Sequence, residues 1–175
     1  MLYHTLSGLV KAANVPAGPD AAVPTAGGDS VYVTNNSKGG YINGIKVVTP
    51  DVAASNGVIH VIGRVLLPPS GNIVQVAQSD TSISYLVAVV LRASRGNSNV
   101  AQVLSGNGPY TVFAPVNDDA FRAAGFPTIN DINSTEPNTL ASILTYHVIG
   151  SRIFSSDLTN GARCQLIMEE LCQLG

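Results

Sequence analysis

The stretch Asn56–Asn72, NGVIHVIGRVLLPPSGN, divides the chain into two halves. It begins as a short apolar strand and then runs into a Pro-Pro-Ser-Gly joint at Pro68–Gly71. The residues before the joint show short β-type segments separated by turn residues, whereas the residues after it show the 3.6-residue period of amphipathic helices. The joint therefore marks a seam between a β-rich half and a helical half.

An internal repeat supports this division. The segment Leu2–Gly18 reads LYHTLSGLVKAANVPAG, and the segment Leu144–Gly161 reads LTYHVIGSRIFSSDLTNG. Aligning their Tyr-His pairs also aligns apolar residues and a closing glycine. The further aligned pairs are Leu6 with Ile149, Val10 with Ile153, Asn14 with Asp157, Val15 with Leu158 and Gly18 with Gly161. We therefore expect the tail of one repeat followed by the head of the next.

Composition argues against several classes of protein. Only 11% of the residues are charged and the net charge is −2, so a nucleic-acid surface is not expected. The 45% hydrophobic content argues against disorder. No apolar run reaches the roughly 18 residues that a membrane span needs, and no signal peptide opens the chain.

The β-rich half is predicted to be an antiparallel meander. The expected strands are Ser30–Thr34, Tyr41–Val48 with an interruption near Asn43-Gly44, and Gly57–Leu66. Met1–Gly28 carries the first Tyr-His segment and a Pro/Gly/Ala-rich loop, and Thr49–Ser55 is read as a second loop. The last strand is apolar on both faces, so we expect it to be covered on both sides.

The helical half is predicted from its apolar spacing and its capping residues. We expect short helices at Ile73–Ala77 and Asn97–Leu104, and a longer helix over Ile83–Leu91 that is capped by Ser82 or Asp80. A strand is expected at Tyr110–Phe113. A further helix is expected to start at Asn117, which caps it, and a last helix covers Ser134–Val148. Together the halves predict an α+β fold. The expected single core consists of Val58, Ile59, Val61, Ile62, Leu86, Val90, Val112, Phe113, Leu140 and Leu144.

Three stretches together resemble the fasciclin domain family. Tyr110–Phe121, YTVFAPVNDDAF, resembles the first signature box of the family, and Asn56–Leu66, NGVIHVIGRVL, resembles the second. Tyr146-His147, and Tyr3-His4 in the other copy, resemble its tyrosine-histidine segment. One departure is Gly63, where the family usually carries an aspartate. The resemblance implies a β-wedge or sandwich covered by a cluster of helices, here assembled from permuted halves because the second box precedes the first.

The expected domain organisation follows from the seam and the repeat. Residues 1–67 are the tail of one fasciclin-like repeat, 68–71 are a linker, and 72–162 are the head of the next, together forming one domain. The chain can fold back as a circular permutant, swap halves in a dimer, or form open polymers. We favour the permuted monomer, with the swapped homodimer second, because domain ends commonly lie close together.

The last residues, Arg163–Gly175, fit neither copy of the repeat. One set of codons for them can be read out of frame as a sequence close to VPTAGGDS, which begins at Val23. Our hypothesis is that they are frame-shifted or otherwise non-native, and the alternative is an amphipathic terminal helix. The chain's two cysteines, Cys164 and Cys172, lie in this stretch.

No motif supports catalysis, a metal or a cofactor. The histidines His4, His60 and His147 lack metal-ligand spacing, and a buried imidazole bonded to backbone explains them better than a ligand or catalytic role. Asp118-Asp119 fits acids at a helix start better than a metal pair. The glycines lack phosphate-binding spacing, and no nucleophile elbow occurs. We therefore expect no enzyme and no cofactor.

The family resemblance implies a non-catalytic extracellular or cell-surface adhesion module that binds a cell-surface or matrix protein or a glycan. The possible interaction residues that it implies are Tyr146, His147, Val148, Ile149, Tyr3 and His4. A Tyr-His pair at a helix end followed by apolar residues is explained equally well as core and cap. The alternative function, also implied by the resemblance, is a carrier of a hydrophobic pigment or lipid in a groove between helices and sheet.

Overall fold

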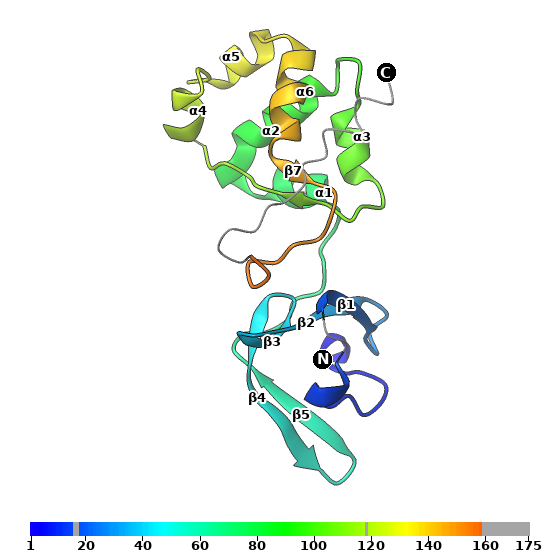
Figure 1. Cartoon of the computed structure of the whole chain (residues 1–175). Coiled ribbons are helices and arrows are strands. Elements are labelled where there is room, and N and C mark those ends of the chain that lie inside the picture. The colour runs from blue at the N-terminus through cyan, green and yellow to red at the C-terminus, as the bar shows by residue number, and fades with distance from the viewer. Residues whose placement is uncertain (16–17, 118, 159–175) are drawn as a thin grey trace. The chain divides into compact units, whose positions relative to one another are not determined.

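The computed structural model describes residues 1–15, 18–117 and 119–158, which fall into two compact units (Figure 1). The β unit contains the residues up to Pro68 together with the later segment Ile153–Leu158. The helical unit contains Pro69–Arg152. The proposed non-native tail, Arg163–Gly175, lies outside the described residues. The combination of helices and antiparallel strands confirms the α+β class.

The β unit is built on a five-stranded antiparallel sheet in which each strand pairs with the next along the chain. The predicted meander is therefore confirmed. Its strands are β1 (Gly18–Pro24), β2 (Ser30–Asn36), β3 (Gly39–Ile42), β4 (Ile45–Ala54) and β5 (Gly57–Ile62). Short 3₁₀ turns at Leu2–His4 and Ala12–Asn14 shape the N-terminal segment that precedes them.

The turn between β3 and β4 has the residues that its geometry demands. Ile42 pairs with Ile45, so Asn43 and Gly44 form a two-residue hairpin loop. Both have positive φ, of 48° and 75°, which is the type I′ pattern that favours Asn-Gly. A side chain at Gly44 would also meet Phe154, whose Cβ lies 3.1 Å from an ideal Cβ position. The predicted interruption of the strand near Asn43-Gly44 is confirmed.

Two predicted loops of the β unit are strands. β1 carries Pro19 and Pro24, which an edge strand tolerates because its outer N–H groups need no partner in the sheet. β4 continues through the predicted loop Thr49–Ser55 as far as Ala54. It does so by a bulge in which Pro50 and Asp51 stand opposite His60, with Asp51 at φ 56°. The proline and the aspartate mark this bulge rather than the end of the strand.

The core of the β unit is small. It consists of the buried residues Tyr3, Val31, Val33 and Leu66, with partly buried neighbours that include Ile42 and Ile62. On the other face of β5, Ile59 and Val61 are exposed by 56% and 44%. The prediction that this strand is covered on both sides is therefore wrong. The side chains of the strand do alternate between two faces as predicted, but one of these two apolar faces lies in solvent.

Among its described residues, the helical unit contains six α-helices, a 3₁₀ helix at Thr81–Ile83 and a two-stranded sheet. The helices are α1 (Ile73–Ser79), α2 (Ser84–Ala93), α3 (Val100–Ser105), α4 (Asp119–Ala123), α5 (Ile129–Ser134) and α6 (Pro137–Thr145). The strands are β6 (Thr111–Val112) and β7 (Val148–Ile149). The predicted helix Ser134–Val148 is thus too long at both ends, because Pro137 begins α6 and Val148 already belongs to β7.

Side chains fix where these helices begin, partly in a way that the sequence did not reveal. Asp80 accepts a hydrogen bond from Ser82 N–H and caps the 3₁₀ turn before α2, close to its predicted role. Asn117 does not serve as predicted. Its Oδ1 accepts from the N–H of Tyr85 at 2.9 Å, so it caps the first turn of α2 across the fold. Nδ2 of Asn117 donates to Thr81 O and to Ser84 Oγ, which holds the same turn.

The helical unit has its own core, so the predicted single core is wrong and two separate clusters exist. Four of the predicted core residues are buried in this cluster: Leu86, Val90, Leu140 and Leu144. Val112 packs against them and is partly buried. Phe113, predicted to be buried, is 46% exposed. Because β6 alternates, Val112 points inward and its neighbour points outward.

Candidate functional site

The second Tyr-His pair lies where α6 ends. Tyr146 is the C-cap residue, and its N–H donates to the carbonyl oxygen of Ile143 at 3.2 Å. Its side chain is 61% exposed. The imidazole of His147 is half-buried, and its Nδ1 lies 3.0 Å from the same carbonyl oxygen of Ile143. Since a carbonyl only accepts, Nδ1 of His147 carries the proton.

The two residues that follow are part of the fold rather than of the surface. Val148 and Ile149 form β7, which pairs with β6, and both are buried. The N–H of Phe113 extends this pairing by donating to the carbonyl oxygen of His147 at 2.8 Å. Of the four residues predicted here as an interaction segment, the structure therefore presents Tyr146 to solvent, half-buries His147 and buries the other two.

Two further exposed apolar residues belong to the backbone segments around Tyr146. Phe113 stands beside His147 through the backbone bond just described, and Ile143 lies one helical turn before Tyr146. Both are exposed. We call Phe113, Ile143 and Tyr146 the Tyr146 patch. The sequence analysis missed both residues: it places Phe113 in the core, and the i, i+3, i+4 spacing of Leu140, Ile143 and Leu144 groups Ile143 with the buried face of α6.

The first Tyr-His pair lies in a different environment, on the sheet of the β unit. Tyr3 is only 8% exposed. Its hydroxyl donates to the carbonyl oxygen of Ser30 at 3.3 Å and accepts from Nδ2 of Asn43 at 3.0 Å. Nε2 of His4 accepts from the N–H of Leu66 at 3.1 Å, just after the last strand. The pair therefore ties the N-terminal segment to the sheet.

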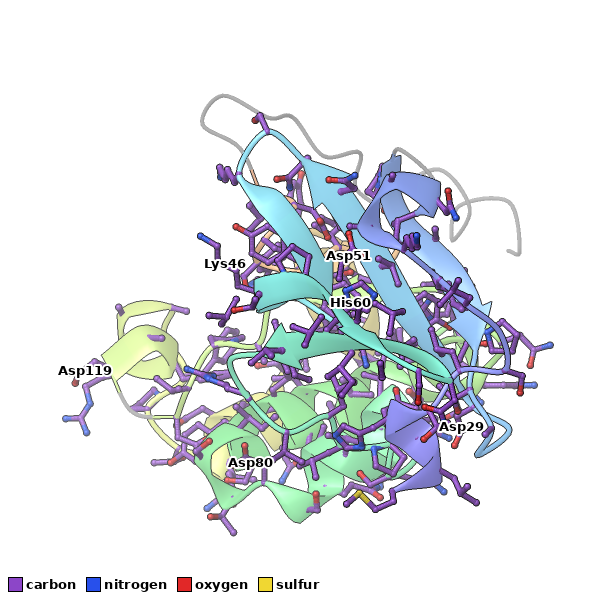
Figure 2. The ribbon with its side chains drawn as sticks, turned by 90° about the horizontal axis from the view of Figure 1, so that it is seen from below. Asp29, Lys46, Asp51, His60, Asp80 and Asp119 are labelled. Atoms are coloured by element: carbon purple, nitrogen blue, oxygen red, sulfur yellow. The ribbon has the colours of Figure 1, made fainter. Side chains whose placement is uncertain are left out.

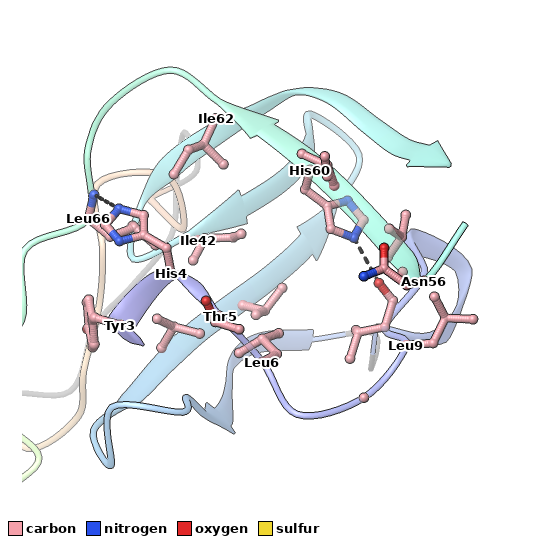
Figure 3. Close-up of a pocket in the computed structure, with 17 residues that line it drawn as sticks. Tyr3, His4, Thr5, Leu6, Leu9, Ile42, Asn56, His60, Ile62 and Leu66 are labelled. Carbon is pink, nitrogen blue, oxygen red and sulfur yellow. Dashed lines mark hydrogen bonds between the residues drawn. The ribbon is translucent and has the colours of Figure 1, made fainter. Parts of the chain in front are cut away.

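A cavity of about 640 Å³ lies within the β unit, between this N-terminal segment and the sheet (Figure 3). Its apolar lining includes Leu6, Leu9, Val33, Ile42, Val58 and Ile62. Figure 3 shows His4 near one end of the lining, and His60 and Asn56 near the other. The cavity is of the size that binds small molecules, and its walls are mainly apolar with a few polar groups.

His60 is held by backbone on both ring nitrogens. Nε2 lies 2.8 Å from the carbonyl oxygen of Val10, and Nδ1 accepts from the N–H of Asp51 at 3.4 Å. Figure 2 shows Asp51 and His60 together on the neighbouring strands β4 and β5. The Asp51 carboxylate also accepts from the N–H of Ala12 at 3.0 Å. These bonds fasten the N-terminal segment over the cavity and leave His60 no free nitrogen for a ligand.

The ionisable groups of the described residues form no metal centre, since no three His, Cys, Asp or Glu side chains are grouped among them. Two carboxylates, those of Asp80 and Glu136, have a lowered pKa. Hydrogen bonds from the Ser82 side chain and then its backbone lower the pKa of Asp80, and bonds from the backbone of Asn138 and then Thr139 lower the pKa of Glu136. Both are helix-capping groups, and the charged form is the better acceptor.

No single helix in the described part of the chain has the length and apolar character of a membrane span. Two consecutive helical segments, Ile73–Ser79 and Thr81–Ala93, are together long and apolar enough for a span, by length and composition only, and they are bent by 103° relative to each other.

Comparison with known proteins places the chain in context. The model of the fasciclin domain matches residues 1–68 and 87–171. Periostin from Homo sapiens is 30% identical over 164 residues, which are 92% of this chain and 18% of periostin. Protein sll1483 from Synechocystis sp. is 35% identical over 112 residues, covering 63% of this chain and 59% of that protein. The chain thus spans less than two thirds of the length of either relative.

A solved structure gives a weaker match. The FAS1 domain pair from the insect cell adhesion molecule Fasciclin I has a TM-score of 0.42 and 19% identity, and the match covers 89% of this chain and 57% of that one.

Proposed function

This chain belongs to the fasciclin domain family, and from that premise we propose that it is a non-catalytic adhesion module. It binds a protein or glycan of the cell surface or extracellular matrix. The contact surface is the Tyr146 patch of the helical unit. The single observation that carries the proposal is the exposure of Tyr146 at the end of α6, next to residues that are firmly buried.

The chemistry of the patch supports this assignment. Tyrosine combines a large apolar ring with a hydroxyl, and tyrosines are enriched among residues that dominate binding energy at protein interfaces. Tyr146 is held by the end of α6 and by the β6–β7 pairing that follows, so little conformational freedom is lost on binding. Phe113 and Ile143 enlarge the apolar area around it. Each of the three histidines has a ring nitrogen bonded to backbone, as a structural role requires.

The experiment measures attachment of cells and of matrix preparations to surfaces coated with the purified chain. We expect attachment to the wild-type chain and a loss of at least tenfold in the double variant Phe113→Ser, Tyr146→Ala. The matched control is Leu91→Ser, because Leu91 is 49% exposed on α2 of the same unit and lies outside the patch. Equal attachment to all three proteins, or to none of them, would refute the proposed function.

A second candidate function is supported by the cavity of the β unit. An uncharged, mainly apolar molecule such as a lipid or pigment would match its walls, because the lining contains no lysine, arginine or acidic residue. This site differs from the groove between helices and sheet that the resemblance implies, since it lies within the β unit alone.

Loading with an apolar fluorescent dye, Nile red, tests this candidate. Val58→Trp would place a large ring in the cavity and should abolish the dye's fluorescence gain. Val48→Trp is the control, because Val48 is exposed on β4 and does not line the cavity. A gain that survives Val58→Trp would contradict binding in this cavity.

A further inference from the structure

A second cavity, of about 170 Å³, lies within the helical unit. It is lined by residues of α2, α4 and α6 and by the segments next to α4 and α6. Its floor belongs to the core, since five of its lining residues are buried: Leu86, Val89, Phe121, Leu140 and Leu144. Ala120, Ala124 and Ile143 also line the cavity and are exposed, so they form its mouth. The cavity is therefore closed by the core at one end and reached from solvent at the other.

The size and walls of this cavity match one aromatic ring. An apolar cavity of about 150 Å³ can hold a single benzene molecule, and this cavity is of the same size. Phe121 and Phe126 give it aromatic walls. The ring of Phe121 is held by an edge-on contact with Tyr85, with ring centroids 5.4 Å apart. Because aromatic rings gain from edge-to-face and offset contacts with one another, these walls favour an aromatic ligand over an aliphatic chain.

His147 adds one polar group to this apolar lining. Among the described residues that line the cavity, it alone has a polar side chain. Its Nδ1 donates to the carbonyl oxygen of Ile143 at 3.0 Å, so Nε2 of the neutral ring is an acceptor. Nε2 makes no hydrogen bond to any described residue. A ligand that displaces water from the cavity must therefore bring its own donor, because an acceptor left unpaired costs free energy.

We propose that the cavity binds a phenol, that is, a single aromatic ring that carries a hydroxyl group. The ring packs on the buried floor and against Phe121, and its hydroxyl donates to Nε2 of His147. Such a group belongs either to a free small phenol or to a tyrosine side chain of a partner protein. The site goes beyond the proposed adhesive function and does not rest on it, although Ile143 belongs both to the mouth of the cavity and to the Tyr146 patch.

The test is an NMR titration of the full chain, labelled in its leucine methyl groups and histidine ring nitrogens, with p-cresol and with toluene. With p-cresol we expect saturable shifts of the methyl signals of Leu86, Leu140 and Leu144, and an upfield shift of Nε2 of His147 as it accepts a hydrogen bond. Toluene lacks the hydroxyl and is the more apolar ligand, so apolar burial alone would favour it. We nevertheless expect toluene to have a Kd at least threefold higher and to leave Nε2 unshifted.

Two variants of α4 place the binding in this cavity. Ala120→Phe fills the mouth and should raise the Kd of p-cresol at least tenfold. Ala123→Phe is the control and should keep the wild-type Kd, because Ala123 is exposed on the same helix and does not line the cavity.

The peptide Gly-Gly-Tyr-Gly-Gly separates the two sources of the ligand. Competition with p-cresol would assign the site to a tyrosine of a partner, and a lack of competition would assign it to a free phenol. The inference is overturned by the absence of saturable shifts with p-cresol, by toluene that binds as tightly, or by wild-type binding in Ala120→Phe.

Discussion

Asn43 donates a hydrogen bond of 3.0 Å from its side-chain amide to the hydroxyl oxygen of Tyr3. The same asparagine accepts from the N–H of Tyr32 at 2.8 Å and occupies the left-handed conformation of the β3–β4 turn. One turn residue therefore joins a hairpin to the N-terminal segment. The Tyr-His pair of the β unit is held by the geometry of this Asn-Gly turn.

Tyr3→Phe tests that relationship. The change removes the hydroxyl and leaves the ring in place, so we expect a loss of about 0.5–1.5 kcal/mol in the free energy of unfolding. Denaturant unfolding measures it. Tyr146→Phe is the control, because that tyrosine is exposed, and it should change the value by less than about 0.5 kcal/mol. Equal effects of both substitutions would contradict the docking of Tyr3 described here.

Leu86→Ala tests the core of the helical unit. Leu86 is buried on α2, and removing its side chain leaves a cavity, so we expect destabilisation by roughly 2–5 kcal/mol. Leu91→Ala, on the exposed side of the same helix, should cost less than about 0.5 kcal/mol. Both values come from denaturant unfolding. A loss for Leu86→Ala as small as that of the control would show that the buried face of α2 is misassigned.

The capping carboxylates predict an acid-sensitive helical unit. Their folded-state pKa values lie below the unfolded ones, so the stabilisation is complete above the unfolded pKa, about 4, and is lost as the pH falls through the folded pKa. We expect the melting temperature to fall below about pH 4. In Asp80→Asn and Glu136→Gln the fall should be shallower. An unchanged slope in both variants would contradict the capping role of these acids.

The absence of a metal-binding group among the described residues predicts independence from divalent ions. The melting temperature of the purified chain and its binding to a matrix preparation should be unchanged by EDTA. Loss of either in EDTA, followed by recovery with zinc or calcium, would show that the chain uses a metal after all.

Much of the fold could be predicted because the deciding signals are local. The alternation in Ser30–Thr34, the Asn43-Gly44 turn and the apolar face of Leu86, Val90, Leu140 and Leu144 each depend on a few neighbouring residues. The division near Pro68 also follows from a local signal, the change of hydrophobic period at the Pro-Pro-Ser-Gly joint, and the switch from strands to helices occurs there.

The errors concern non-local relationships. Asn117 looked like the cap of its own helix, and only the tertiary structure shows that it caps α2 instead. Ile59 and Phe113 were assigned to the core because they are apolar, but exposure depends on what covers a face, which periodicity does not reveal. The bulge at Asp51 likewise extends a strand through residues that usually form a loop. The permuted pairing of the two halves stays a prediction.

The sequence identified the residues of the candidate site but not their exposure, and their role in binding stays a prediction. The repeat identified the Tyr-His pairs, and the structure shows that the two copies differ, one docked and one exposed. The sequence did not separate exposed Tyr146 from buried Val148 and Ile149, because strand β7 is only two residues long and pairs with a distant segment. Segments this short carry no periodicity.

A competition assay tests most directly the central claim that Tyr146 carries the adhesive contact. Cells or matrix bind to a surface coated with the wild-type chain while soluble chain is added at increasing concentration. We predict that Tyr146→Ala needs at least a tenfold higher concentration than the wild-type chain for half-maximal inhibition, and that Leu91→Ala matches the wild type. Inhibition by Tyr146→Ala at the wild-type concentration would contradict the claim.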